Sequence, residues 1–226
     1  MKITYYGHSC FEIEVKGSKL LFDPFITPND LAKKIDIKKI QPDFILISHG
    51  HADHIADCVA IAEQSGATVV GNYEVINWLK KQGLKNCHDM NIGGKWMRDF
   101  GKVKCVSAVH SSSMPDGSYG GTAMGFIIES SEGNFYYSGD TALTNDMKLI
   151  GEYRQLNFAL LPIGDNYTMG IDNAVICSDF IRCNKIVGMH YDSFPPIVID
   201  KDEALNKFRN AGKELILMDI GASMTI

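Results

Sequence analysis

The chain has 226 residues, 45% of them hydrophobic, with 27 acidic side chains against 22 lysines and arginines. This length suits one compact domain, and the apolar content excludes an intrinsically disordered chain. The net charge of −5 provides no broad positive field, so we expect no nucleic-acid partner.

The first predicted element is a β-hairpin. Phe11, Ile13 and Val15 alternate with polar residues, and a turn-forming sequence at residues 16–18 separates them from an apolar run at 20–22. Alternation with a period of two residues is typical of a strand with one buried face. We therefore predict that the chain opens with antiparallel β-structure.

Short apolar runs of strand length recur through the rest of the chain. They lie at residues 44–47, 68–70, 103–109, 124–128, 135–137, 158–161, 186–187 and 215–218. Their length and their content of β-branched and aromatic residues favour strands over helices.

Three helical patterns lie between these runs. The clearest begins at Asn72, whose side chain can cap a helix N-terminus, and ends at Gly83. Its apolar side chains on one face are Val75, Ile76 and Leu79. The other two patterns cover residues 172–182 and 202–211. Strands that alternate with helices predict sheets covered by helices, a layered α/β arrangement.

No feature of the sequence divides the chain or directs it to a membrane. It contains no repeat and no linker, so we predict one domain over residues 1–226. The N-terminal residues lack the apolar core of a signal peptide, and no apolar run approaches the roughly 20 residues that span a bilayer. We therefore expect a cytoplasmic protein without a membrane partner. The six cysteines have no regular spacing, which indicates neither a disulfide framework nor a zinc knuckle.

The sharpest feature is the sequence Ser-His-Gly-His-Ala-Asp-His at residues 48–54, directly after the apolar run at 44–47. Its metal-capable side chains are His49, His51, Asp53 and His54. Two histidines two residues apart on an extended turn can converge on one ion, while the Asp and His that follow can turn toward a second. The small residues Gly50 and Ala52 leave room for this approach. A histidine-rich surface loop is the alternative interpretation, but four grouped side chains favour a metal site.

Three further candidates follow apolar runs later in the chain: His110, Asp140 and His190. In layered α/β folds, ligand-binding groups gather beyond the carboxyl ends of strands. Each of the three could by itself be an ordinary buried histidine or a turn-forming aspartate. Together with the 48–54 loop they form one consistent set, whereas His88 has no such context.

These motifs resemble those of the metallo-β-lactamase superfamily of hydrolases. The resemblance extends over nearly the whole chain, including the Ser-Gly-Asp-Thr sequence at 138–141. It implies a four-layer αββα sandwich. It also implies one metal ion held by His49, His51 and His110, a second held by Asp53, His54 and His190, and Asp140 as a bridge between them.

Within that superfamily the chain is similar to stand-alone bacterial hydrolases grouped with L-ascorbate-6-phosphate lactonase. The similarity rests on Tyr-Gly-His-Ser at residues 6–9, Leu-Pro-Ile-Gly at 161–164 and the segment 190–197. In this context His8 is expected to bind an oxyanion or to protonate a leaving group, although a structural histidine is an equal alternative. Asp23 is a candidate to orient a metal-bound histidine, with a turn-forming Asp-Pro sequence as the equal alternative. Tyr191 and the loop 167–170 are candidates to line the substrate pocket, although simple packing is the favoured alternative.

The expected chemistry is hydrolysis of a small-molecule substrate. Imidazole and carboxylate donors without thiolate suit Zn²⁺, and also Mn²⁺ or Fe²⁺. Two such ions about 3.5–4 Å apart would activate a shared water to hydroxide and polarise an ester, lactone or phosphoester. Asp53 is expected both to bind the second ion and to orient the hydroxide or shuttle its proton.

Two other functions remain open at this point. An RNA-processing nuclease or phosphodiesterase could use the same site, although the acidic balance of the chain argues against RNA docking. A metal-binding sensor without catalytic activity would also keep such a site, but candidates at all seven positions favour turnover. The sequence leaves a monomer and a homo-oligomer equally open.

Overall fold

Two seven-stranded sheets form the centre of the computed structural model, which describes residues 1–226. In order across the first sheet, the strands are β14 (Ser223–Thr225), β1 (Lys2–Gly7), β2 (Cys10–Val15), β3 (Ser18–Phe22), β4 (Phe44–Leu46), β5 (Thr68–Asn72) and β6 (Cys87–Met90). The second sheet comprises β13 (Glu214–Ile216), β12 (Lys185–Met189), β11 (Phe158–Pro162), β10 (Gly133–Tyr137), β9 (Met124–Ser130), β8 (Gly101–Ser107) and β7 (Lys95–Arg98). Both sheets mix parallel and antiparallel pairs.

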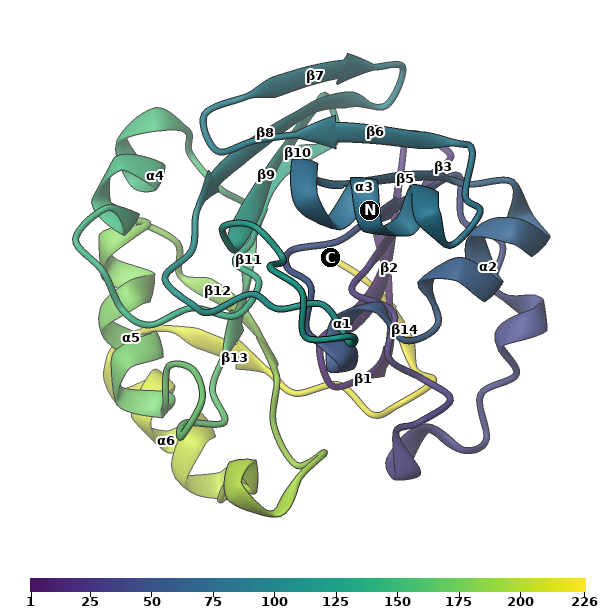
Figure 1. Ribbon diagram of the computed structural model, residues 1–226. Coiled ribbons are helices and arrows are strands. Elements are labelled where there is room, and N and C mark those ends of the chain that lie inside the picture. Colours follow the sequence, from purple (N-terminus) through teal and green to yellow (C-terminus); the bar gives the residue numbers. More distant parts are fainter.

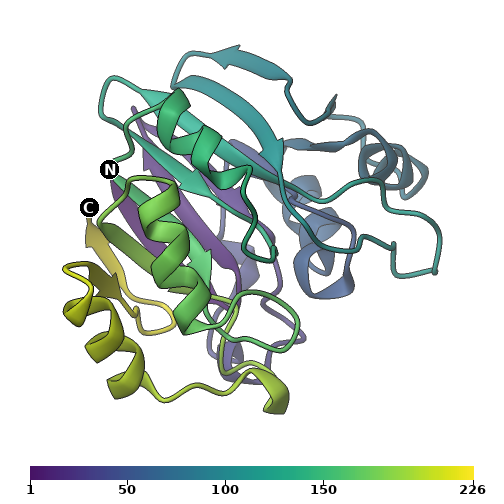
Figure 2. The ribbon, with the colours of Figure 1, turned by 90° about the vertical axis from the view of Figure 1, so that its left-hand side faces the viewer.

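Helices cover the outer face of each sheet (Figures 1 and 2). The first sheet carries α1 (Ala52–Ile55), α2 (Cys58–Ser65) and α3 (Tyr73–Lys81). The second carries α4 (Met147–Tyr153), α5 (Ile171–Phe180) and α6 (Lys201–Asn210). This arrangement is the αββα sandwich that the resemblance implied. None of these helices combines the length and the apolarity needed to cross a bilayer.

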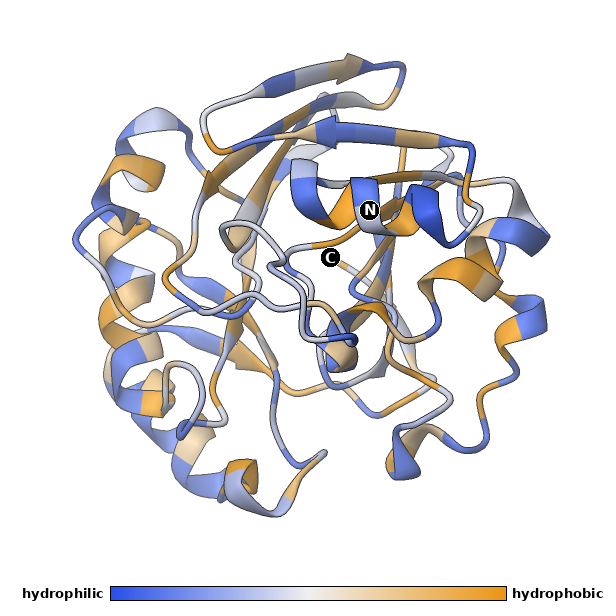
Figure 3. Ribbon diagram, in the orientation of Figure 1, coloured by the Kyte–Doolittle hydropathy of each residue, from blue (hydrophilic) through white to orange (hydrophobic).

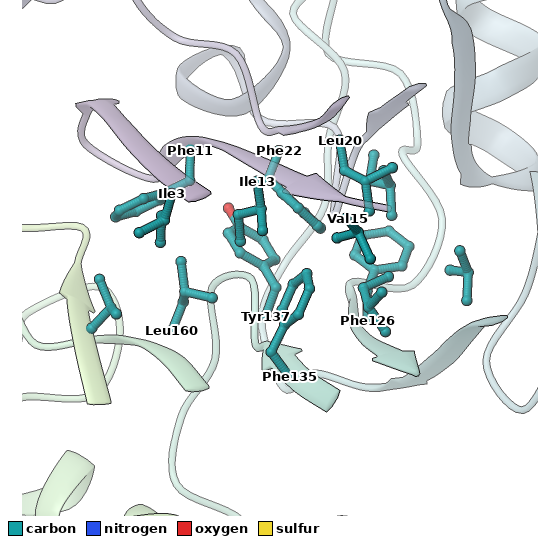
Figure 4. Packing of buried hydrophobic residues seen from close by; sticks show 14 of the residues in the cluster. Ile3, Phe11, Ile13, Val15, Leu20, Phe22, Phe126, Phe135, Tyr137 and Leu160 are labelled. Atoms are coloured by element: carbon teal, nitrogen blue, oxygen red, sulfur yellow. The ribbon is translucent and has the colours of Figure 1, made fainter. Parts of the chain in front are cut away.

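Three apolar cores hold the layers together. The central core comprises 23 buried residues between the sheets, among them Phe22 and Tyr137, whose rings stack 4.6 Å apart (Figure 4). Each outer core comprises 18 buried residues between one sheet and its helices. In β4, Ile45 faces an outer core and Leu46 the central core. A strand buried on both faces is apolar throughout, whereas the helices alternate hydrophobic and hydrophilic residues (Figure 3).

The predicted strands and helices are present. The hairpin pairs β2 with β3, and Phe11 lies opposite Phe22. Each apolar run contributes a strand whose ends shift by up to two residues, so that the run 103–109 becomes β8. The three helical patterns are α3, α5 and α6, and Asn72 caps α3 by accepting a hydrogen bond from the backbone N–H of Val75 at 2.8 Å.

Several short elements were not predicted. The edge strands β6, β7 and β14 and the helices α1, α2 and α4 carry no long apolar pattern. In β7, for example, Lys95, Met97 and Arg98 are all exposed. An edge strand pairs on one side only and buries few side chains, so its hydrophobic signal is weak.

The candidate residues lie at one edge of the sandwich because of strand direction. β1, β3 and β4 run parallel in the first sheet, as do β8, β10 and β12 in the second. The residues that follow the ends of these strands are, in the same order, His8, Asp23, residues 48–54, His110, Asp140 and His190. The strand ends of both sheets therefore deliver polar side chains to one place.

Candidate metal centre

The structure brings six of the seven predicted metal ligands together in two adjoining groups, and the seventh, Asp140, lies between them. In the first, the ligand atoms of His49, His51 and His110 lie within 4.8 Å of one another. The second group, with the same spacing, contains Asp53, His54, His190 and also His8. The remaining histidine, His88, lies apart, stacked on Trp96 with ring centroids 4.2 Å apart.

Asp140 lies between the two groups. Its Oδ2 atom is 2.9 Å from His190 Nε2 and 3.2 Å from His54 Nε2, both in the second group. The same atom is 3.6 Å from His110 Nε2 in the first group. The carboxylate is therefore within reach of both groups, at the position expected of a bridging ligand.

The first group depends on a tight turn. His49 Nε2 and His51 Nδ1 are 3.0 Å apart, and the two rings are nearly perpendicular. At Gly50, between them, an added Cβ would lie 2.5 Å from Met114 Sδ and 3.2 Å from the carbonyl oxygen of Ser113. Glycine is favoured here because the loop that contains Ser113 and Met114 packs directly against the turn.

The second group lies at the start of α1 and opens to solvent at Asp53. The Asp53 Oδ2 atom is 3.1 Å from His8 Nε2, 3.8 Å from His54 Nε2 and 3.9 Å from His190 Nε2. Its side chain is 26% exposed, whereas those of His54 and His8 are fully buried. Asp53 is therefore the member of this group that a substrate can reach.

A buried carboxylate, Asp23, orients two of the histidines. Its Oδ2 atom accepts hydrogen bonds from His54 Nδ1 at 2.8 Å, from the Ser48 hydroxyl at 2.5 Å and from the Tyr137 hydroxyl at 2.7 Å. Because the Ser48 hydroxyl donates to Asp23, it accepts from His49 Nδ1 at 2.9 Å. Both histidines are thus protonated on Nδ1, and their Nε2 lone pairs are directed into the centre.

The sequence suggested Asp23 for this purpose, and the hydrogen bond to His54 is present. Ser48 and Tyr137 were missed because a serine beside a motif and a tyrosine in an apolar strand carry no distinctive signal. Only the packing of β10 against β3 brings the Tyr137 hydroxyl to Asp23.

Several buried polar atoms in the centre have no hydrogen-bond partner. They are His54 Nε2, Asp140 Oδ1 and His190 Nδ1. An unpaired buried polar atom costs about 1–3 kcal/mol, so native structures rarely leave several in one place. Such atoms, together with seven imidazole and carboxylate donors, fit divalent cations such as Zn²⁺, Mn²⁺ or Fe²⁺.

Burial favours neutral histidines in the centre, and the ionised carboxylates oppose this effect. Burial lowers the pKa of His49 well below its usual value. Burial alone would raise the pKa of Asp140, but the neighbouring His190 and His54 outweigh it and hold that pKa well below its usual value. Burial likewise opposes the charged form of His54, yet Asp140, Asp53 and Asp23 together raise its pKa. The ionised carboxylates therefore attract positive charge, which a metal ion can supply.

His8 lies against the second group with both ring nitrogens engaged. Nε2 is 3.1 Å from Asp53 Oδ2, and Nδ1 is 2.5 Å from Ser193 Oγ. Burial lowers the pKa of His8 to about 4, so the ring is neutral at pH 7. An ionised carboxylate only accepts hydrogen bonds, so Nε2 carries the proton and Nδ1 accepts from the Ser193 hydroxyl. Ser193 was not anticipated from the sequence.

The backbone is strained at three of these residues. His8, Asp23 and His190 have φ angles of 55°, 41° and 55°, in the left-handed region that side chains other than glycine rarely adopt. The backbone N–H of His190 donates to the His8 carbonyl at 2.9 Å and links two of the three. Strain of this kind persists where the surroundings impose it, and it concentrates at functional sites.

A groove of about 660 Å³ opens beside Asp53. Its other lining residues are Phe25, Pro28, Ala52, Tyr167, Phe194, Pro195 and Pro196. The prediction that the loop 167–170 lines a pocket is therefore correct for Tyr167. For Tyr191 the packing alternative holds, because Tyr191 is buried in an outer core between the second sheet and its helices.

Known proteins resemble the chain over most or all of its length. Residues 18–191 match the family described as Beta-lactamase superfamily domain. A UPF0173 metal-dependent hydrolase of Christiangramia forsetii is 52% identical over 227 residues, with 100% of both chains covered. One of Bacillus anthracis is 42% identical over 234 residues, again with 100% of both covered. The structure of Igni18, a metallo hydrolase of the archaeon Ignicoccus hospitalis, is 36% identical with a TM-score of 0.90, covering 100% of this chain and 97% of that one.

Proposed function

Because the chain belongs to the β-lactamase superfamily and is a metal-dependent hydrolase, we propose that it uses two divalent cations to cleave a small ester, lactone or phosphoester. The observation that carries this proposal is the position of Asp140 within 3.6 Å of histidines from both groups. In addition, Asp140 Oδ1 and His54 Nε2 are buried without a hydrogen-bond partner. A single ion could occupy only one of the two groups of ligand atoms.

The proposed ligands follow the two groups. His49, His51 and His110 would hold one ion, Asp53, His54 and His190 would hold the other, and Asp140 lies within reach of both groups. Zn²⁺ is the first choice for such donors, with Mn²⁺ or Fe²⁺ as alternatives. His8 is close enough to be a ligand, but its nitrogens are engaged by Asp53 and Ser193, so we assign it a hydrogen-bonding role.

When bound, the cations would lower the pKa of a water molecule toward neutrality and polarise the substrate oxygen. Asp53 faces the groove, and its carboxylate can orient the attacking oxygen and accept its proton. His8 donates from Nε2 to Asp53 and thereby holds that carboxylate in place. Through Asp53, a proton can pass on to the leaving group without His8 becoming charged.

Metal content and turnover measured on the same preparation test this proposal. Protein reconstituted with Zn²⁺ or Mn²⁺ is analysed for metals and then assayed on aryl esters, lactones and bis-aryl phosphodiesters. We expect about two ions per chain and hydrolysis of at least one class, abolished by chelation and restored by metal. The variant His51→Ala is the inactive comparison. Stoichiometric metal without turnover on any class would instead favour the sensor interpretation.

A further inference from the structure

The groove beside Asp53 has a marked chemical character. Aromatic rings, prolines and one alanine make up seven of its eight lining residues, and Asp53 is the only carboxylate among them. Its volume of about 660 Å³ lies within the roughly 300–1,000 Å³ usual for small-molecule sites. The surface next to the metal centre is thus apolar, with a single carboxylate at its inner end.

This apolar surface is continuous with the metal centre. The Phe25 and Phe194 rings both pack edge-on against the His8 ring, at centroid distances of 5.3 and 5.5 Å. They also contact each other at 5.9 Å. A group bound in the groove therefore lies beside His8 and beside Asp53, one of the proposed ligands.

Both walls of the groove are anchored. The Asp57 carboxylate accepts the backbone N–H groups of Ile26 and Thr27 at 2.6 and 2.9 Å, which fixes the segment behind Phe25. On the other side, the backbone N–H of Met169 donates to the Thr141 carbonyl at 3.0 Å and ties the Tyr167 loop to the segment after Asp140. The groove is preformed, yet the Tyr167 side chain stays 54% exposed.

None of the eight residues that line the groove is basic, and two lysines on the flanking segments are paired with carboxylates. Lys201 lies 3.2 Å from Asp192, and Lys33 lies 3.0 Å from Asp30. A phosphate or carboxylate at the far end of a substrate would thus meet aromatic rings and prolines, with Asp53 as the nearest charge in the groove. Burying an unpaired charge against such surface is unfavourable.

We infer that the substrate carries an uncharged, apolar group, an alkyl chain or an aromatic ring, which packs against Phe25, Tyr167 and Phe194 while the scissile bond lies at the metal centre. The inference rests on the proposed function and narrows it to substrates in which the scissile ester, lactone or phosphoester bond carries an apolar substituent. It departs from the phosphorylated substrate that a likeness to L-ascorbate-6-phosphate lactonase would suggest.

Straight-chain alkyl hydroxamic acids test the inference by binding alone, because the hydroxamate binds the metal and only the chain can enter the groove. Dissociation constants of the four-, six- and eight-carbon compounds are measured calorimetrically on metal-loaded protein. We expect affinity to rise by up to about fourfold per added methylene. An eight-carbon hydroxamate with a terminal carboxylate should lose most of that gain.

Variants connect the chain-length effect to the groove. Tyr167→Ala and Phe194→Ala should flatten the dependence on chain length, whereas Tyr167→Phe should keep it. Tyr73→Ala is the matched control, because Tyr73 is 56% exposed, lies on α3 and is not among the lining residues. It should bind every hydroxamate as the unaltered protein does.

The outcomes separate the two proposals. Metal-dependent binding of the hydroxamates without any chain-length effect would overturn the apolar-group inference and leave the hydrolase proposal standing. The same holds if the eight-carbon hydroxamate with a terminal carboxylate binds as tightly as the one without it. If no hydroxamate binds to metal-loaded protein, the proposed centre and the inference fail together.

Discussion

The closed and the open side of the metal centre are built on different principles. On the closed side, Asp23 is fully buried and accepts hydrogen bonds from Ser48, His54 and Tyr137. On the open side, Asp53 is partly exposed and adjoins a groove of aromatic rings and prolines. Fixed tautomers and ring positions come from the closed side, while contact with a substrate is confined to the open side. Substitutions on the closed side should therefore disturb the orientation of the histidines, whereas substitutions on the open side should disturb contact with a substrate.

The largest effect is expected where the two sides meet, at Asp140. Asp140→Ala should lower kcat/KM by about 1,000-fold or more, because the stabilisation of charge that depends on the bound ions is worth several kcal/mol. Bound metal should fall below two ions per chain in elemental analysis. Asp172→Ala, which removes an exposed carboxylate paired with Lys207, should change neither quantity. Full activity in Asp140→Ala would exclude a bridging role.

Asp23→Asn should damage the closed side without touching a proposed ligand. The amide cannot accept all the hydrogen bonds that Asp23 receives, so we expect unfolding to become easier by about 3–5 kcal/mol. Metal affinity should fall about 10- to 100-fold, because His49 and His54 lose their orientation. Asp57→Asn serves as the control, since Asp57 is a buried carboxylate that accepts only backbone N–H groups near Phe25. It should lose stability and keep its metal affinity, and equal metal loss in both variants would count against the orienting role.

The lowered pKa of His8 predicts that the free energy of unfolding of the metal-free protein depends on pH. Burial lowers its pKa from 6.5 to about 4, so the unfolded chain takes up a proton near pH 6.5 that the folded protein resists until about pH 4. The stability contributed by neutral His8 is therefore present above pH 6.5 and is lost as the pH falls, by roughly 3 kcal/mol in all. Relative to His8→Gln, the unaltered protein should lose that much free energy of unfolding between pH 7 and pH 4 in urea titrations. If the free energy of unfolding depends on pH in the same way for both proteins, His8 does not have this environment.

The smallest effect comes from two neighbouring tyrosines of β10. Tyr137→Phe removes the hydroxyl that donates to Asp23 at 2.7 Å and should cost about 1 kcal/mol of stability. The Tyr136 hydroxyl is buried without a partner, so Tyr136→Phe should be neutral or slightly stabilising. The stabilities of the two variants are compared by thermal unfolding. A larger loss in Tyr136→Phe than in Tyr137→Phe would reverse the assignment.

The sequence predicted the convergence of the site well because the relevant signals are local. The grouped histidines at 48–54 and the single His110, Asp140 and His190 each follow an apolar run, and parallel strands bring such ends to one edge. Strands buried on both faces were equally visible, since every residue in them is apolar.

The missed features depend on contacts between distant segments. Ser193 reaches His8 across 185 positions of the chain, and Tyr137 reaches Asp23 across 114. Neither residue type is unusual in a loop or a strand, so no local pattern marks it. Tyr191 was a pocket candidate only because it adjoins His190, and its burial in the core matches the packing alternative. The groove likewise could not be foreseen, because its walls come from four separate segments.

The most direct test of the paired metal centre is a crystal grown with Zn²⁺ or Mn²⁺ and an anomalous-scattering map recorded from it. The account predicts two peaks, one among His49, His51 and His110 and one among Asp53, His54 and His190, with Asp140 between them. A map with no peak at these residues, or with a single peak at full occupancy, would contradict it.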